Sequence, residues 1–186
     1  FFATLDNRTT TTCLGFHTNR YKNNDPKKPV LPLHYNERSI FLPAGPGIDP
    51  LEGNRPLVGG KHSKEAREEF EKRRDRLDNL RDERAERRAA GEKVPTTASK
   101  VKYRGRKDLD VFEVEQVSAK VTSQEWLKRQ PRFFVESTLG KTRAQLFLDG
   151  NLPIEKFTDL GGKPLTLAEL RNTAAGEKAF RRAGLD

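Results

Sequence analysis

The sequence predicts an α+β protein that is mostly helical and extended, built from several small parts. Hydrophobic residues make up 33% of the chain and charged residues 34%, against roughly 45–50% and 25% in typical soluble domains. Such a chain is too polar for one large core, although 11 Phe among 186 residues permit local cores. The composition also changes along the chain, so that stretches typical of turn, helix and strand follow one another.

We expect five consecutive parts. They are a small irregular β/loop module (1–42), an extended Pro/Gly arm (43–62), a long charged helix (63–91), a linker with a β-hairpin (92–121) and a small C-terminal bundle of short helices (122–186). The arm contains PAGPGIDPLEGNRPLVGG, a run of turn-forming residues without periodicity. Because this arm cannot bury enough of itself, we expect it to be ordered only by what it lies against.

The long helix is predicted from strong helix formers without Pro between Lys64 and Ala90. Ser63 can cap its N-terminus, and Gly91 follows as a stop. Its acidic and basic residues nearly cancel, which argues against a grip on nucleic acid and favours either a solvated helix or a helix packed in an assembly. Its few apolar residues share one narrow face: Phe70, Leu77 and Leu80.

A β-hairpin is predicted over Lys100–Val117, with its turn at 105–108. Basic residues alternate along its first strand, so they would lie on one face. This strip is either a charged edge that prevents aggregation or a contact for phosphate, DNA or an acidic partner. The alternating residues are Lys100, Lys102, Arg104 and Arg106, and the neighbouring Lys107 is a further candidate for the same contact. The formal net charge of +9 and pI near 9.8 also favour acidic partners.

Short helices with clear start signals are predicted from residue 122 onward. The stretches TSQE, beginning at Thr122, and TLAE, beginning at Thr166, both match the capping box. The apolar residues of this part can supply one small helical core: Trp126, Leu127, Phe133, Phe134, Leu139, Leu146, Phe147, Leu152, Phe157, Leu165, Leu167 and Leu170.

Several classes of protein gain no support. A single Cys excludes an internal disulfide, and no apolar run approaches the roughly 20 residues of a membrane span. No signal peptide is visible. The chain begins with Phe1 and contains no Met, so we expect that an N-terminal portion of the translated protein is missing from it.

Two polar stretches near the N-terminus belong together: LDNRTTTTCLGFH, which we expect to form no core, and LPLHYNERSIFLP. They resemble the signature of the phage Mu F-type minor head proteins, the head-morphogenesis family, which reads roughly Leu-Asp-x-Arg-Thr, then Cys, then Pro-x-His-x-Asn-Cys-Arg-Ser. The matching residues are Leu5, Asp6, Arg8, Thr9, Cys13, Pro32, His34, Asn36, Arg38 and Ser39. The stretch from Trp126 to Arg171 is also similar to the tail that follows this domain in many members.

The resemblance implies a structural virion component present in few copies. Residues 1–42 would be the end of the head-morphogenesis domain. Proteins of this kind associate with the portal at one vertex of the phage head, assist head assembly, and in some cases contact packaged DNA or leave with it. The implied partners are therefore the portal protein and other head proteins, with non-specific contact to packaged DNA, and neither a membrane nor a small-molecule substrate. The implied location is the phage head near the portal vertex, with the host cytoplasm during assembly.

The same motif is compatible with a zinc site or with a structural role. Cys-x3-His and His-x2-Glu spacings supply four donors that zinc accepts: Cys13, His17, His34 and Glu37. The family pattern has Cys where this chain has Glu37, a weaker ligand for a soft site. We therefore expect hydrogen bonds rather than a bound metal, and a turn fixed by Asp6 and Arg8.

A phage-borne nuclease or toxin-type enzyme and a DNA-binding regulator are the alternative functions. His34, Arg38 and Ser39 could form a phosphodiester-cleaving set, which needs an acid and a base around one phosphate. The sequence contains three His in all, and it shows no P-loop, paired-carboxylate motif or nucleophile elbow. A regulator would be expected to show helix-turn-helix or zinc-finger spacing, which is not recognisable here. We therefore expect no catalytic residues.

Overall fold

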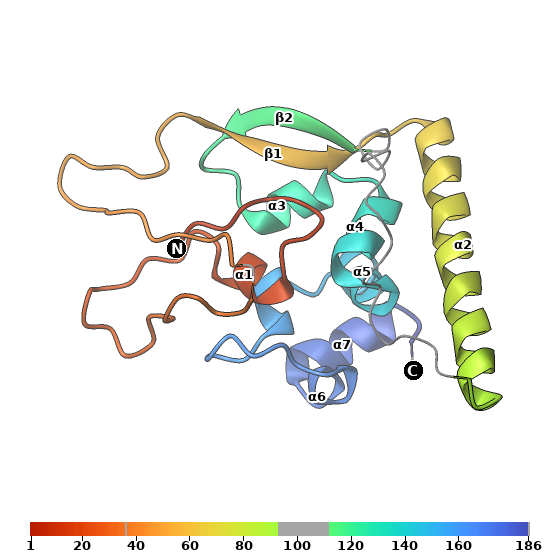
Figure 1. The fold of residues 1–186 in the computed structure, drawn as a ribbon. Coiled ribbons are helices and arrows are strands. Elements are labelled where there is room, and N and C mark those ends of the chain that lie inside the picture. The colour runs from red at the N-terminus through yellow and green to blue at the C-terminus, as the bar shows by residue number, and fades with distance from the viewer. Residues whose placement is uncertain (36, 93–111, 186) are drawn as a thin grey trace. The chain divides into compact units, whose positions relative to one another are not determined.

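The computed structural model describes residues 1–35, 37–92 and 112–185 (Figure 1). The chain forms two compact units, one of Phe1–Gly59 with Val114–Asp186 and one of Gly60–Glu113. Helices make up 44% of the structure and a two-stranded antiparallel sheet accompanies them, so the predicted, mostly helical α+β class is confirmed. Among the described helices, no segment is both long and apolar enough to cross a membrane.

The first helix, α1 (Thr11–Phe16), is a buried element of the first unit. Leu5, Cys13 and Leu14 are at most 2% exposed, so the prediction that this stretch forms no core is wrong. Its threonines are accommodated because their hydroxyls are hydrogen-bonded: Thr10 caps α1 by accepting from the Cys13 NH, and Thr12 Oγ1 donates to the Gly162 carbonyl at 2.8 Å. A polar sequence therefore becomes core without leaving unsatisfied groups.

The sheet pairs β1 (Asn54–Gly60) with β2 (Phe112–Ser118), which lie side by side in Figure 1. β2 is the predicted second strand of the hairpin, but in the structure as described it pairs with β1, from the predicted arm. The arm therefore differs from the prediction over its last residues. Leu57 is 3% exposed, the Val58 NH donates to the Leu5 carbonyl at 2.9 Å, and Trp126 Nε1 donates to the Val58 carbonyl at 3.2 Å.

The part of the arm before β1 remains irregular and largely exposed. It forms a local turn in which Gly45 and Ile48 exchange backbone hydrogen bonds of 3.4 and 3.0 Å. The predicted first strand of the hairpin, with its turn at 105–108, lies outside the described residues.

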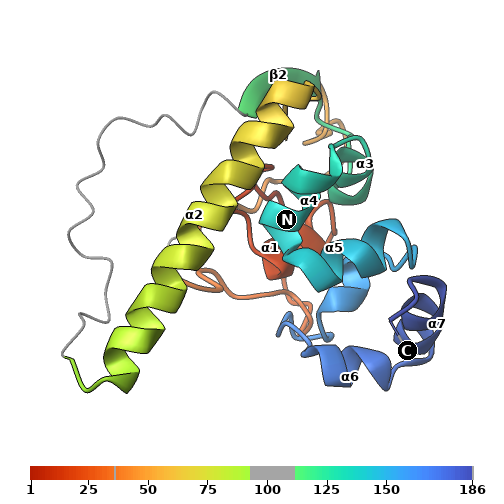
Figure 2. The same cartoon turned by 90° about the vertical axis from the view of Figure 1, so that its right-hand side faces the viewer.

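The C-terminal helices are the best-packed part of the first unit. They are α3 (Ser123–Lys128), α4 (Arg132–Leu139), α5 (Lys141–Leu148), the 3₁₀ helix η2 (Ile154–Phe157), α6 (Leu167–Arg171) and α7 (Ala174–Arg182). Figures 1 and 2 show α6 beside α7 and α4 beside α5. Both predicted capping boxes are confirmed at Thr122 and Thr166.

The predicted core of these helices is confirmed except at two positions. Leu165 is half-buried and Leu167 is 39% exposed, whereas the other predicted residues are buried. Trp126 and Phe134 meet edge-to-face, with ring centroids 5.7 Å apart. Helix α1 packs on η2, and Ser123 Oγ donates to the Leu14 carbonyl at 2.7 Å. Residues from both predicted terminal domains therefore share one unit.

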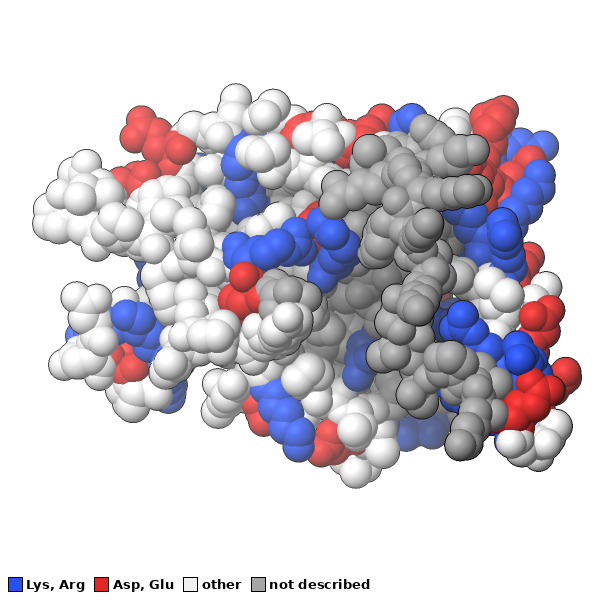
Figure 3. All heavy atoms as spheres, viewed as in Figure 1, with Lys and Arg blue, Asp and Glu red and all other residues white. Residues whose placement is uncertain are grey.

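In the second unit, the predicted long helix is confirmed as α2 (Lys64–Ala89). Ser63 accepts a hydrogen bond from the Ala66 NH at its start, and Gly91, with φ of +82°, follows its end. Lys and Arg alternate with Asp and Glu along the helix (Figure 3). Two ion pairs illustrate this arrangement: Glu69 pairs with Arg73, four residues later, and Arg87 bonds Glu92 at 2.6 Å.

The C-terminal core should dominate the stability of the first unit. Phe134 is fully buried, so Phe134→Ala should lower the free energy of unfolding by about 3–5 kcal/mol, since it removes apolar burial and leaves a cavity. Leu167→Ala, at a position 39% exposed, is the matched control and should cost less than about 1 kcal/mol. Denaturant unfolding followed by Trp126 fluorescence measures both changes. Equal losses for the two variants would contradict this account of the core.

Candidate functional site

The two motif stretches lie together in the first unit. The Phe2 and Ile40 backbones exchange hydrogen bonds of 2.8 and 3.0 Å, which places the second stretch beside the first. Arg38 then pairs with Asp6 through both ends of its guanidinium, with Nη1 donating to Oδ2 at 2.5 Å and Nη2 to Oδ1 at 2.9 Å. This bidentate geometry is the strong form of the Arg–carboxylate pair. The expectation that the two stretches belong together therefore has a physical basis.

Asp6 is the centre of this junction. Its Oδ1 also accepts from the Arg8 NH at 2.9 Å and from Thr9 Oγ1 at 3.1 Å. Burial raises the pKa of the Asp6 carboxyl, but the hydrogen bonds from Arg38, Arg8 and Thr9 outweigh it, so the net pKa lies below the usual value. The predicted turn at Asp6 and Arg8 is thus present through the main chain. The guanidinium of Arg8 stays 3.9 Å away and 66% exposed, and the charge partner is Arg38.

A second group, which we call the donor cluster, consists of the side chains of Cys13, His34 and Glu37. Cys13 Sγ lies 3.1 Å from His34 Nε2 and 3.4 Å from Glu37 Oε2, and the latter two atoms are 3.4 Å apart. Cys13 comes from α1, and the other two come from the loop before Arg38. The three offer one ligand atom each within a small space, so the group could hold a metal ion.

The fourth residue of the predicted zinc set, His17, lies elsewhere. Its Nδ1 accepts from the Ala3 NH at 3.2 Å, and its Nε2 lies 2.9 Å from Nη2 of Arg55. The Ala3 contact needs the lone pair of Nδ1, which a neutral imidazole keeps when its hydrogen is on Nε2, where the Val121 carbonyl oxygen lies 3.4 Å away. A protonated imidazole has no lone pair and would lose the hydrogen bond from Ala3. Burial, with the positive charge of Arg55 beside it, lowers the pKa of His17 to about 4.

Arg55 is a residue that sequence reasoning missed, because it lies in the Pro/Gly-rich run. It is 7% exposed, donates to the Ala3 carbonyl at 3.2 Å, and its guanidinium lies 4.4 Å from the ring centre of Phe2. Burial lowers the pKa of Arg55 to about 10. The sequence signal that could have placed it inward is its spacing of two residues from Leu57, since such residues of a strand share one face and both are buried here.

The residues weighed for catalysis have separate partners. His34 Nε2 faces Cys13 and Glu37, the Arg38 guanidinium binds Asp6, and the Ser39 NH donates to Glu37 Oε1 at 2.8 Å. Burial, with the Glu37 carboxylate nearby, raises the pKa of the Cys13 thiol in spite of the hydrogen bonds that oppose this. Asn36 and the basic strip, Lys100, Lys102, Arg104, Arg106 and Lys107, fall in segments for which no structure is described.

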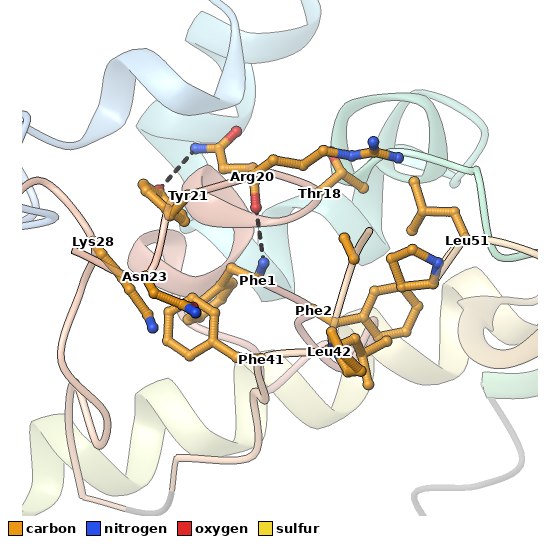
Figure 4. Close-up of a pocket in the computed structure, with 14 residues that line it drawn as sticks. Phe1, Phe2, Thr18, Arg20, Tyr21, Asn23, Lys28, Phe41, Leu42 and Leu51 are labelled. Carbon is orange, nitrogen blue, oxygen red and sulfur yellow. Dashed lines mark hydrogen bonds between the residues drawn. The ribbon is translucent and has the colours of Figure 1, made fainter. Parts of the chain in front are cut away.

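A cavity of about 280 Å³ lies apart from the donor cluster, and none of the predicted site residues lines it. Figure 4 shows Phe1, Phe41 and Tyr21 around it. Lys28 Nζ lies 4.8 Å from the centre of the Phe41 ring, and the exposed Arg20 guanidinium is 3.7 Å from the Asp49 carboxylate. The cavity therefore combines aromatic surface with positive charge.

Comparisons with protein-family models, with curated proteins and with solved structures found no match for this chain. The family resemblance of the two motif stretches therefore stays a prediction.

The Asp6–Arg38 pair should contribute more to the free energy of unfolding than the exposed Arg8 side chain does. Arg38→Gln leaves the buried Asp6 carboxylate without its charge partner, so we expect a loss of about 2 kcal/mol in the free energy of unfolding. Arg8→Gln, the matched control, removes an exposed guanidinium and should cost less than about 0.5 kcal/mol. Chemical denaturation of both variants and of Asp6→Asn/Arg38→Gln tests the pairing. A larger loss in Arg8→Gln than in Arg38→Gln would refute it.

Stability should fall on mild acidification because of His17. Its pKa is about 4 in the folded chain and 6.5 ordinarily, so between these values the unfolded chain binds more protons. The contribution of neutral His17 is complete above pH 6.5 and is lost as the pH falls towards 4, at a cost of about 3 kcal/mol. His17→Gln should flatten the pH dependence of unfolding in this window. The exposed His62→Gln should keep the wild-type slope, and an unchanged slope in His17→Gln would disprove the assignment.

Proposed function

We propose that this chain is a structural minor head protein of a tailed bacteriophage that binds the portal. One observation carries the proposal. The residues that match the Mu F-type signature lie in two separated stretches, yet their side chains bond one another, as Asp6 does with Arg38 and Cys13 with His34. A chance match in two stretches gives no reason for the matched residues to be contact partners. In this chain several of the matched residues join the stretches, as expected of a family signature that maintains one folded module.

The charge distribution supports a protein partner at α2. This helix contains 10 Lys and Arg and 9 Asp and Glu, a net charge of +1 out of +9 for the chain. Leu77 and Leu80 on it are 57% and 40% exposed. Exposed apolar side chains on a charge-balanced helix suit packing against another protein better than binding of phosphate.

The proposal places the protein in the phage head near the portal vertex, and in the host cytoplasm during assembly. It assigns no catalytic function, no membrane and no small-molecule substrate. Contact with packaged DNA would be non-specific and sensitive to salt, because alternating Lys and Arg residues bind phosphates and read no base edges. The basic strip that includes Lys100 and Arg106 supplies such residues.

The test is co-purification with the portal protein of the same phage. We expect the wild-type chain to associate with the portal, and Leu77→Ser/Leu80→Ser to weaken this association at least several-fold while leaving the fold intact. Asn79→Ser, on the opposite side of α2, is the matched control and should bind as the wild type does.

Nucleic-acid assays run beside the portal assay discriminate between the classes. Absence of portal binding, together with sequence-specific DNA binding that survives physiological salt, would favour a regulator. RNA cleavage lost in His34→Gln would favour the enzyme.

A further inference from the structure

We propose that Cys13, His34 and Glu37 bind one zinc ion, and that this ion ties α1 to the loop that carries Arg38. The proposal rests on the donor cluster alone and does not depend on the proposed function. It reverses the expectation from sequence, in which Glu37 in place of Cys argued against a metal.

Two of the three distances within the donor cluster match a zinc coordination shell, and the third, between Sγ and Nε2, is about 0.2 Å shorter than the range for such a shell. Sγ, Nε2 and Oε2 form a triangle with edges of 3.1, 3.4 and 3.4 Å. Zinc bonds of about 2.0–2.3 Å at tetrahedral angles place neighbouring ligand atoms about 3.3–3.6 Å apart. A point equidistant from the three atoms lies about 1.9 Å from each in their plane, so an ion slightly above this plane reaches ordinary bond lengths.

The neighbouring hydrogen bonds aim two of the donors at the ion. His34 Nδ1 lies 2.8 Å from the Tyr35 carbonyl oxygen, which can only accept, so Nδ1 carries the hydrogen and the neutral ring presents the Nε2 lone pair to the cluster. Glu37 Oε1 accepts from the Arg38 NH at 3.1 Å and the Ser39 NH at 2.8 Å. These contacts hold the carboxylate so that Oε2 faces His34.

The same hydrogen bonds turn the lone pair of His34 Nε2 towards Oε2 of Glu37, 3.4 Å away. The Nε2 lone pair faces a carboxylate oxygen, and two lone pairs at this distance repel unless a proton or a cation lies between them. The neighbouring hydrogen-bond donors are the Cys13 thiol, the Thr10 hydroxyl, 3.2 Å from both Sγ and Nε2, and the Ser39 side chain, which hydrogen-bonds to Cys13 and Glu37. One divalent cation would bind all three ligand atoms, Sγ, Nε2 and Oε2, at once.

The chemistry of the donors selects zinc, and the surroundings leave it an open position. Thiolate and imidazole are ligands for zinc rather than for calcium or magnesium, which prefer oxygen. The cluster borders a cavity of about 20 Å³, which has room for one water molecule. Three protein ligands and one water complete a tetrahedral shell.

Metal content and cobalt spectroscopy of the intact chain test the proposal. Chain purified without chelator should contain about one zinc per molecule. Because Cys13 is the only Cys and Met is absent, a sulfur-to-cobalt charge-transfer band after exchange with Co²⁺ can come only from Cys13. Cys13→Ser should abolish this band, and His34→Gln and Glu37→Gln should each weaken zinc binding at least tenfold. The exposed His62→Gln is the matched control and should bind zinc as the wild type does.

A variant that is expected to bind zinc more tightly keeps the proposal testable even if the variants that lose a ligand fail to fold. Glu37→Cys supplies a second thiolate, so it should bind zinc more tightly than the wild type. Failure of the wild type to take up zinc or Co²⁺, or full zinc content in Cys13→Ser, would overturn the proposal in favour of a purely hydrogen-bonded cluster. A zinc affinity in Glu37→Cys no higher than that of the wild type would equally exclude position 37 from the coordination shell.

Discussion

The bidentate pairing of Asp6 with Arg38 is the interaction on which the N-terminal part of this protein depends. Most of residues 1–42 lie outside helices and strands, so backbone ladders provide little of their order. Asp6 replaces such a ladder by binding a backbone NH, a hydroxyl and a guanidinium at once. Because these groups come from different loops, one buried carboxylate determines the path of both. A buried charge is tolerated here because it is fully hydrogen-bonded.

Helix α1 anchors this irregular part of the chain to the C-terminal segments. Hydrogen bonds from Thr12 to the Gly162 carbonyl and from Ser123 to the Leu14 carbonyl join α1 to the C-terminal segments. Cys13 is therefore presented from a buried helix, whereas His34 and Glu37 reach it from an adjacent loop. This combination of one rigid ligand and two loop ligands lets a metal act on structure, since binding would fix the loop relative to the helix.

The salt bridge and the proposed zinc site act at the same junction by different physical means. Arg38 binds Asp6 through its side chain, and its backbone NH orients Glu37. Residue 38 thus contacts both groups, the paired charge through its side chain and Glu37 through its backbone. Both interactions therefore fix the same loop of the first unit. The Leu77 and Leu80 side chains, to which the proposed function assigns the partner contact, belong to the other unit and are exposed.

Local signals in the sequence determined the helices, and the tertiary structure decided which distant residues meet. The cap at Ser63, the capping boxes at Thr122 and Thr166 and the apolar core of the C-terminal helices follow from interactions within four residues or from hydrophobic periodicity, which any sequence displays directly. Asp6 binds Arg38 rather than Arg8 because the tertiary structure brings the loop at residue 38 back to residue 6. The pairing of β2 with β1 likewise depends on the tertiary structure. For the same reason spacing alone included His17 with the zinc donors, whereas packing turned it towards Arg55. Burial of a polar stretch such as α1 was equally beyond the sequence, because it requires hydrogen-bond partners more than 100 residues away that only the folded chain supplies.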